Sequence, residues 1–154
     1  MTIGRYTRRL VTGFIICLAA LLAAPIASAD GEEARVRALV DRAVEDYRSN
    51  GSNALVKMSQ PDGGYLDGEL YIFVLGPDIV LAHAGTPASV GQKANTTLDW
   101  DGTPVGERIR KAATSDGNWA TYHHRNPATG RVEHKRSWVR IHDGLIFGAG
   151  LYSK

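Results

Sequence analysis

The chain has 154 residues, of which 18 are Lys or Arg, 16 are Asp or Glu, and one is Cys. This length suits one domain with a targeting segment and is too short for two domains of average size. The near balance of charge supplies no basic excess for binding nucleic acid, and a single cysteine excludes an internal disulfide and a thiolate metal centre.

The first 29 residues have the pattern of a secretory signal peptide. Three arginines precede an apolar run over residues 10–26, and small residues follow at 27–29. The alternative is an uncleaved membrane anchor, but Pro25 and a run somewhat shorter than the roughly 20 residues of a membrane span favour cleavage. Both general secretory and twin-arginine export are compatible with the arginines. We therefore expect a periplasmic or secreted protein with one domain over residues 30–154 and no membrane span after cleavage.

Two helices are expected at the start of this domain. Apolar residues recur at helical spacing over residues 32–47, with charged residues between them, and the following Asn50-Gly51 is a stop signal. A shorter helix is expected over residues 53–58, before a break rich in Gly and Pro at 60–64.

Strand patterns follow the helices. Residues 70–75 contain no polar side chain, and residues 79–83 form a second apolar run, so the turn between them predicts a hairpin. Residues 85–102 are irregular and polar, and a short helix is expected over residues 105–113.

The last third of the domain is expected to be antiparallel β structure. Strands are predicted at residues 119–125, 132–142 and 145–152, and Asp143-Gly144 is a hairpin turn signal. The order of elements predicts an α+β domain with an antiparallel sheet and the N-terminal helix packed on one face.

Five short segments match a known pattern in their order and spacing: residues 68–74, 80–83, 126–133, 135–139 and 148–152. Together they resemble the single Cache domain of the second type, the extracytoplasmic ligand-sensing module of bacterial chemoreceptors and sensor kinases. The resemblance spans residues 32–152. It implies a PAS-like fold with a five-stranded antiparallel sheet, a long N-terminal helix on one face and a ligand pocket on the other.

The sequence departs from this family pattern at two places. His124 stands where the family has an aromatic residue, usually tryptophan. The chain also ends at Lys154, whereas membrane-bound members continue into a second transmembrane helix and a signalling domain. We therefore expect a free-standing sensor domain without an output domain of its own, related to chemotaxis and signal transduction.

Two residues are candidate ligand contacts. His83 ends an apolar strand beside the irregular segment, where its imidazole could donate to an anion and titrate near neutral pH; a strand-end histidine satisfied by backbone is the alternative. Lys135 shares a strand face with the apolar Val139 and should point inward. A buried ammonium needs a negative partner, which a bound carboxylate would supply. A lysine at the sheet edge with its head in water is the alternative.

Other candidates lie on the same predicted sheet. Tyr122 and His124 share one face of their strand, and Arg125 could pair with a carboxylate or remain a solvated hairpin residue. The resemblance also implies that large aromatic side chains form the pocket walls. The complete predicted ligand-binding set is Tyr71, His83, Trp119, Tyr122, His124, Lys135 and Trp138.

The resulting hypothesis is a sensor or binding domain for a small organic ligand, specifically a short carboxylate. The alternative is an envelope interaction protein with a vestigial pocket that binds a sensor kinase or another membrane sensor protein. No nucleophile motif, phosphate loop or dinucleotide fingerprint is present, so we predict no enzyme activity and no cofactor. We also predict no metal site, because adjacent His123 and His124 should point to opposite faces of a strand.

Overall fold

A computed structural model describes residues 29–153 of the chain. The predicted signal peptide lies outside these residues, apart from Ala29, which begins the first helix. Helix α1 (Ala29–Asn50) is followed by α2 (Ser52–Met58), and α3 (Val105–Ala112) comes after the irregular segment. None of the helices described is long and apolar enough to cross a membrane.

The strands form one antiparallel sheet. Their bounds are β1 (Leu66–Asp67), β2 (Leu70–Leu75), β3 (Val80–His83), β4 (Asn118–Arg125), β5 (Val132–His142) and β6 (Leu145–Ser153). The order across the sheet is β1-β2-β6-β5-β4, and β3 pairs with the same strand β2. The five longer strands are those that the sequence predicts. The two-residue β1 was not expected, and it makes the sheet six-stranded.

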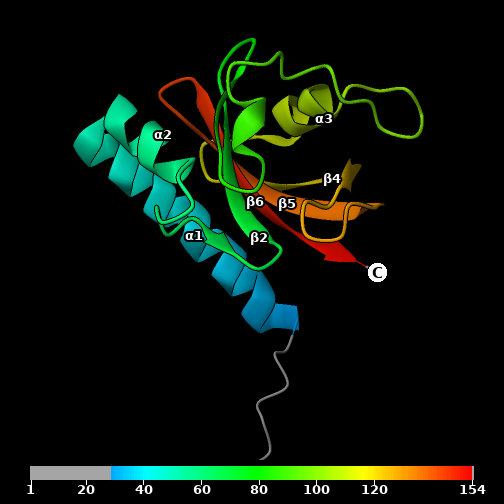
Figure 1. Cartoon of the computed structure of the whole chain (residues 1–154), viewed down its shortest axis with the longest axis horizontal. Helices are drawn as coiled ribbons and strands as arrows, with labels where there is room; N and C mark the ends of the chain where they lie inside the picture. Colours follow the sequence, from blue (N-terminus) through cyan, green and yellow to red (C-terminus); the bar gives the residue numbers. More distant parts are fainter. Residues whose placement is uncertain (1–28, 154) are drawn as a thin grey trace, which may run out of the picture.

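The sheet separates two layers (Figure 1). Helix α1 packs along one face, mainly against β6 and β5, with α2 beside it. The irregular segment and α3 cover the opposite face, and α3 packs on β4. We call residues 85–112, which include this segment and α3, the cap. The predicted α+β architecture with a long N-terminal helix on one face is confirmed.

Strand β2 is buried on both faces because it lies at the centre of these layers. All six of its side chains are buried, which explains why its sequence lacks polar residues. On its helix side, Ile72 and Val74 join a core that includes Val36, Val40 and Val44 of α1. On its other side, Tyr71, Phe73 and Leu75 face the cap.

Gly148 of β6 lets the side chain of Phe73 pack closely against β6. A Cβ atom at Gly148 would lie 2.2 Å from the ring of Phe73, the residue opposite it in the β2–β6 pair. Only glycine at this position therefore leaves room for the Phe73 ring against β6. Gly148 is thus required by the packing beneath the cap.

Candidate functional site

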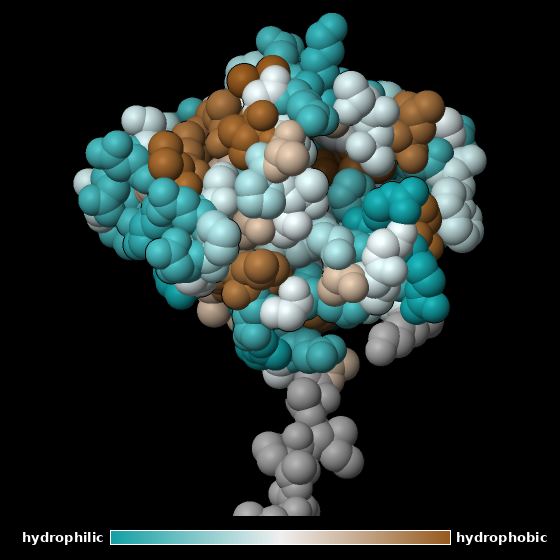
Figure 2. Space-filling model, viewed as in Figure 1, coloured by the Kyte–Doolittle hydropathy of each residue, from teal (hydrophilic) through white to brown (hydrophobic). Residues whose placement is uncertain are grey.

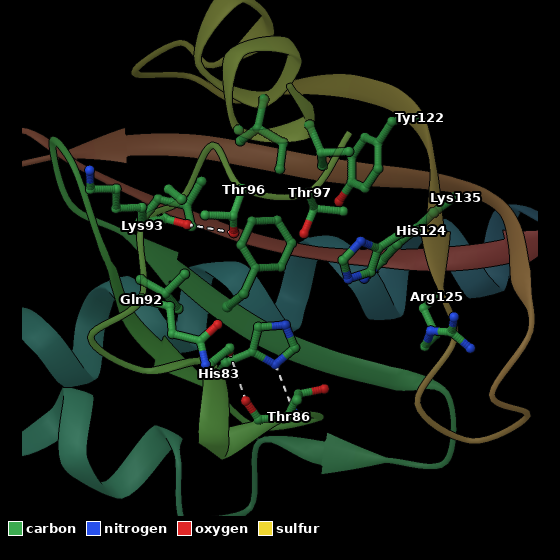
Figure 3. Close-up of a pocket in the computed structure, with 18 of the residues that line it drawn as sticks. His83, Thr86, Gln92, Lys93, Thr96, Thr97, Tyr122, His124, Arg125 and Lys135 are labelled. Carbon is green, nitrogen blue, oxygen red and sulfur yellow. Dashed lines mark hydrogen bonds between the residues drawn. The ribbon is translucent and has the colours of Figure 1, made fainter. Parts of the chain in front are cut away.

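A cavity of about 350 Å³ lies between the sheet and the cap (Figure 3). Strands β2, β3, β4 and β5 supply its floor, and the cap supplies its roof. Five of the seven predicted site residues line it, namely Tyr71, His83, Tyr122, His124 and Lys135. Residues of β2, β3, β4 and β5 thus meet in one place.

Lys135 is the most unusual residue of the cavity. It is 1% exposed, and its Nζ lies 3.8 Å from the centroid of the Tyr71 ring and 4.8 Å from that of Tyr152. The ring of Phe73 lies 5.4 Å away. Burial lowers the pKa of Lys135 well below its usual range. The aromatic faces stabilise a cation only partly, because they supply no negative charge.

His83 presents a donor to the cavity. Its Nδ1 accepts a hydrogen bond from the backbone N–H of Thr86 at 2.8 Å, so the neutral ring carries its proton on Nε2. Burial, with the nearby Lys135 and His124, lowers the pKa of His83 to about 3. This value corrects the expectation that His83 titrates near neutral pH, because the ring is desolvated beneath the cap.

His124 adds a second imidazole on the β4 side. Burial and the proximity of Lys135 lower its pKa to about 4, so this ring is also neutral at pH 7. Its Nδ1 is buried and has no hydrogen-bond partner among the residues that the structure describes. Figure 3 shows His124 beside Lys135 and Arg125 at the same side of the cavity.

Two tyrosines of the cavity are held by hydroxyl contacts outside it. Tyr71 and Tyr152 lie with their hydroxyl oxygens 2.6 Å apart, and Tyr122 contacts the hydroxyl of Ser137 at 2.8 Å. Burial raises the pKa values of Tyr71 and Tyr122 above their usual range, so both phenols stay protonated. Their rings form part of the cavity wall.

The described residues that line the cavity include three cations and no carboxylate. The cations are Lys93, Arg125 and Lys135. Arg125 is exposed, and its guanidinium donates to the carbonyl of Gly130 in the adjacent turn. Lys93 is exposed as well, and it lies at the opposite side of the cavity from Arg125 (Figure 3). The fixed charge around the cavity is therefore positive.

Trp119 and Trp138 lie on the other face of the sheet, which corrects their assignment to the pocket. They are partners in the β4–β5 pair, with ring centroids 5.4 Å apart. The guanidinium of Arg37, on α1, lies 3.9 Å from the centroid of the Trp138 ring. Both indoles thus pack beneath α1, because each is three residues from a cavity-facing residue of its own strand and so has the opposite orientation.

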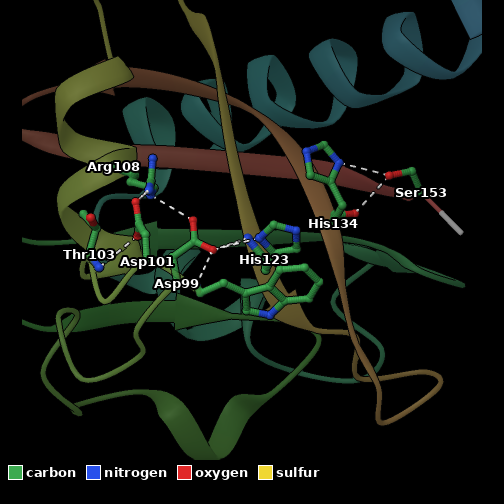
Figure 4. A network of polar contacts seen from close by, with 8 residues as sticks. Asp99, Asp101, Thr103, Arg108, His123, His134 and Ser153 are labelled. Carbon is green, nitrogen blue, oxygen red and sulfur yellow. Dashed lines mark hydrogen bonds and ion pairs between the residues drawn. The ribbon is translucent and has the colours of Figure 1, made fainter.

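A polar network fastens the cap to the edge of the sheet (Figure 4). The carboxylate of Asp99 contacts Nδ1 of His123 at 2.8 Å, accepts from the His123 backbone N–H, and pairs with Arg108 of α3 at 2.8 Å. Burial alone would raise the pKa of Asp99, but these contacts outweigh it and lower the pKa. The ring of Trp100 stacks on His123 at 3.7 Å. His123 thus belongs to this network, whereas His124 lines the cavity.

Asn126 organises the turn at the cavity mouth. It is fully buried, and its side-chain amide donates to Glu69 at 3.0 Å and to Glu133 at 2.8 Å. Its carbonyl oxygen accepts from the backbone N–H of Ala128. The turn thereby places Arg125 and Pro127 at the rim of the cavity. Sequence reasoning found the turn but missed the role of this side chain.

Several lining residues were not predicted. Phe73 was predicted to lie in a strand, but no site role was predicted for it. It is two residues from Tyr71 in the same strand, so alternation alone would have placed both side chains on the cavity face. The polar roof comes from an irregular segment that has no periodicity to indicate which side chains face inward. These roof residues are Thr86, Ser89, Gln92, Lys93, Thr96 and Thr97. Within residues 29–153, no group of three or more His, Cys, Asp or Glu is arranged to hold a metal ion.

Comparison with solved structures identifies the fold. The chain is similar to a methyl-accepting chemotaxis protein from Vibrio parahaemolyticus, with a TM-score of 0.63 and 18% identity over 80% of this chain and 89% of that one. It is similar to a Cache chemosensory domain studied for carboxylic acid recognition, with a TM-score of 0.59 and 19% identity over 81% and 95%. A periplasmic sensor domain of a chemotaxis protein gives a TM-score of 0.60 and 23% identity over 81% and 97%.

These structures agree with the fold that the sequence resemblance implied. The chain has the PAS-like fold of Cache and chemotaxis sensor domains over most of its length. No family model matches the sequence, and no curated protein matches it significantly.

Proposed function

We propose that residues 30–154 form an exported sensor domain that binds a small organic carboxylate beneath the cap. The observation that carries this proposal is Lys135, a buried lysine whose amino group has no anionic partner among the described residues, in a cavity lined by no acid. A buried charge is costly unless a counter-ion and hydrogen bonds accompany it. A bound carboxylate supplies both.

The surrounding groups suit a carboxylate in particular. Its two oxygens accept several hydrogen bonds, and the cavity offers donors from the Lys135 ammonium and from Nε2 of neutral His83. His124 lies on the same side with an unpartnered ring nitrogen. The similarity to a Cache domain studied for carboxylic acid recognition supports the same ligand class.

Calorimetric titration of the purified protein with carboxylates tests this proposal. Lys135→Met keeps the length of the side chain but removes its charge, and it should weaken binding about 10- to 100-fold, by about 1.5–3 kcal/mol. Lys93→Met is the matched control, because Lys93 is an exposed cation at the opposite side of the cavity. Equal affinity of the wild type and the Lys135→Met variant would contradict the proposal.

A second candidate function is binding of an envelope partner, such as a membrane sensor protein. An apolar groove between α2 and the start of the cap favours it. Val56 and Val90, 61% and 42% exposed, line this groove with Leu55, Leu81 and Pro87. Figure 2 shows apolar surface on the side of the molecule where α2 lies. A Val56→Asp variant that loses a co-purifying envelope protein but keeps carboxylate binding would support this function.

A further inference from the structure

The cavity has a polar end and an apolar end. Lys135, His83, His124 and Arg125 lie near Tyr71, at the start of β2. Leu75 lies at the other end of β2, about 13 Å further along a strand that rises about 3.3 Å per residue. Four apolar side chains from three elements line the cavity at that end: Leu75, Val80, Val105 and Ile109. The exposed cap residues Gln92, Lys93 and Thr97 lie beside them at the rim, where their backbones pair with Val80, Ile79 and Val105.

The volume of the cavity exceeds what a very small acid would fill. About 350 Å³ lies within the range of pockets that hold drug-sized ligands, roughly 300–1,000 Å³. Acetate at Lys135 would leave the apolar end empty. Atoms that line an unfilled apolar space lose their dispersion contacts, and water gains few hydrogen bonds there.

Charge is also distributed unequally between the two ends. The buried cation lies at the polar end, while the ammonium of Lys93, at the opposite side, belongs to an exposed residue. Figure 3 shows the Lys93 side chain extending away from His124 and Lys135. One end of the ligand is therefore expected to be anionic and the other uncharged.

We propose that the ligand is an amphipathic monocarboxylate, with its carboxylate at Lys135 and a hydrocarbon body of several carbons against Leu75, Val105 and Ile109. This inference rests on the proposed carboxylate function and makes it more specific. Chain length then sets affinity, since each buried methylene strengthens binding about fourfold. Ile109 and Val105 become the residues that determine specificity.

Titration with straight-chain acids from acetate to octanoate tests the inference. Affinity should rise about fourfold per carbon and level off once the apolar end is filled. Ile109→Phe narrows that end and should move the plateau to shorter acids. Ile109→Ala enlarges the same end, should move the plateau to longer acids, and provides a second variant if the larger ring prevents folding.

Two further comparisons complete the design. Ile141→Phe adds the same ring at an exposed position outside the cavity, and it should leave the whole series unchanged. Dicarboxylates of matched length should bind at least tenfold more weakly than the monocarboxylates, because their second charge would enter the apolar end.

The outcomes separate this inference from the proposed function. A flat series, in which acetate binds as tightly as hexanoate, overturns the amphipathic ligand but keeps a carboxylate site. Tighter binding of dicarboxylates than monocarboxylates also overturns it and makes Lys93 a second anchor. Absence of binding by every acid, in a protein shown to be folded and empty by native mass spectrometry, overturns both proposals.

Discussion

Lys135 decreases the stability of the ligand-free domain if its ammonium lacks a counter-ion. Lys135→Met should therefore raise the free energy of unfolding of the empty protein, by about 1–3 kcal/mol, because it removes an uncompensated buried charge while keeping the packing. Thermal or urea denaturation measures this change. The same variant should lose the stabilisation that a carboxylate gives the wild type.

This pairing of effects distinguishes a ligand contact from a structural residue. If Lys135 instead stabilised the fold through an anionic partner within the protein, Lys135→Met would be less stable than the wild type. That result would contradict the prediction. Lys93→Met, the exposed control, should change stability by less than about 0.5 kcal/mol.

Residue alternation explains both the correct and the incorrect site assignments. The inward orientation of Lys135 follows from its place four residues before Val139, which is fully buried. The same rule places Trp138 on the opposite face, since it lies three residues from Lys135. The resemblance, rather than the alternation, brought Trp119 and Trp138 into the predicted pocket, and the structure places them beneath α1.

At the scale of elements, the buried carboxylate of Asp99 links the cap to the edge of the sheet. Asp99→Ala removes the contacts to His123 and Arg108 together, and it should lower the free energy of unfolding by about 1–3 kcal/mol. Hydrogen exchange should become faster in β4 and in residues 93–104, and bound carboxylate should dissociate sooner.

Asp101 offers a matched control for the cap. It also contacts Arg108, but its side chain is 56% exposed, so Asp101→Ala should lower stability less than Asp99→Ala does and leave exchange in β4 unchanged. Equal effects of the two substitutions would mean that Asp99 does not fasten the cap.

Elements with a clear hydrophobic period were predicted well, and the cap was not. Strand β2 and helix α3 begin where the sequence predicts, because burial on one or two faces gives each a distinct pattern. The orientation of the roof side chains depends on turns and on long-range contacts. One such contact joins Asp99 to His123, 24 positions further along the chain. No local pattern predicts such pairs, so the cap's contribution to the site required the structure.

For the whole molecule, the cavity couples stability to pH. The pKa values of His83 and His124 are about 3 and 4 in the folded protein, against 6.5 for an unperturbed histidine. Below pH 6.5 the unfolded chain therefore binds protons that the folded chain does not. Stability should fall with pH through this window, by up to about 2 kcal/mol for each histidine between pH 7 and 5. The lowered pKa of Lys135 acts in the same direction.

Denaturation of the ligand-free protein at pH 7, 6 and 5 measures this dependence above the range where most carboxylates titrate. His83→Gln and His124→Gln should each reduce the slope of stability against pH, and the double variant should reduce it further. A double variant with the slope of the wild type would mean that both rings are hydrated and that the cap does not exclude water.

A bound carboxylate should favour the protonated form of Lys135, so the ligand-bound protein should show a weaker fall in stability with falling pH than the empty one.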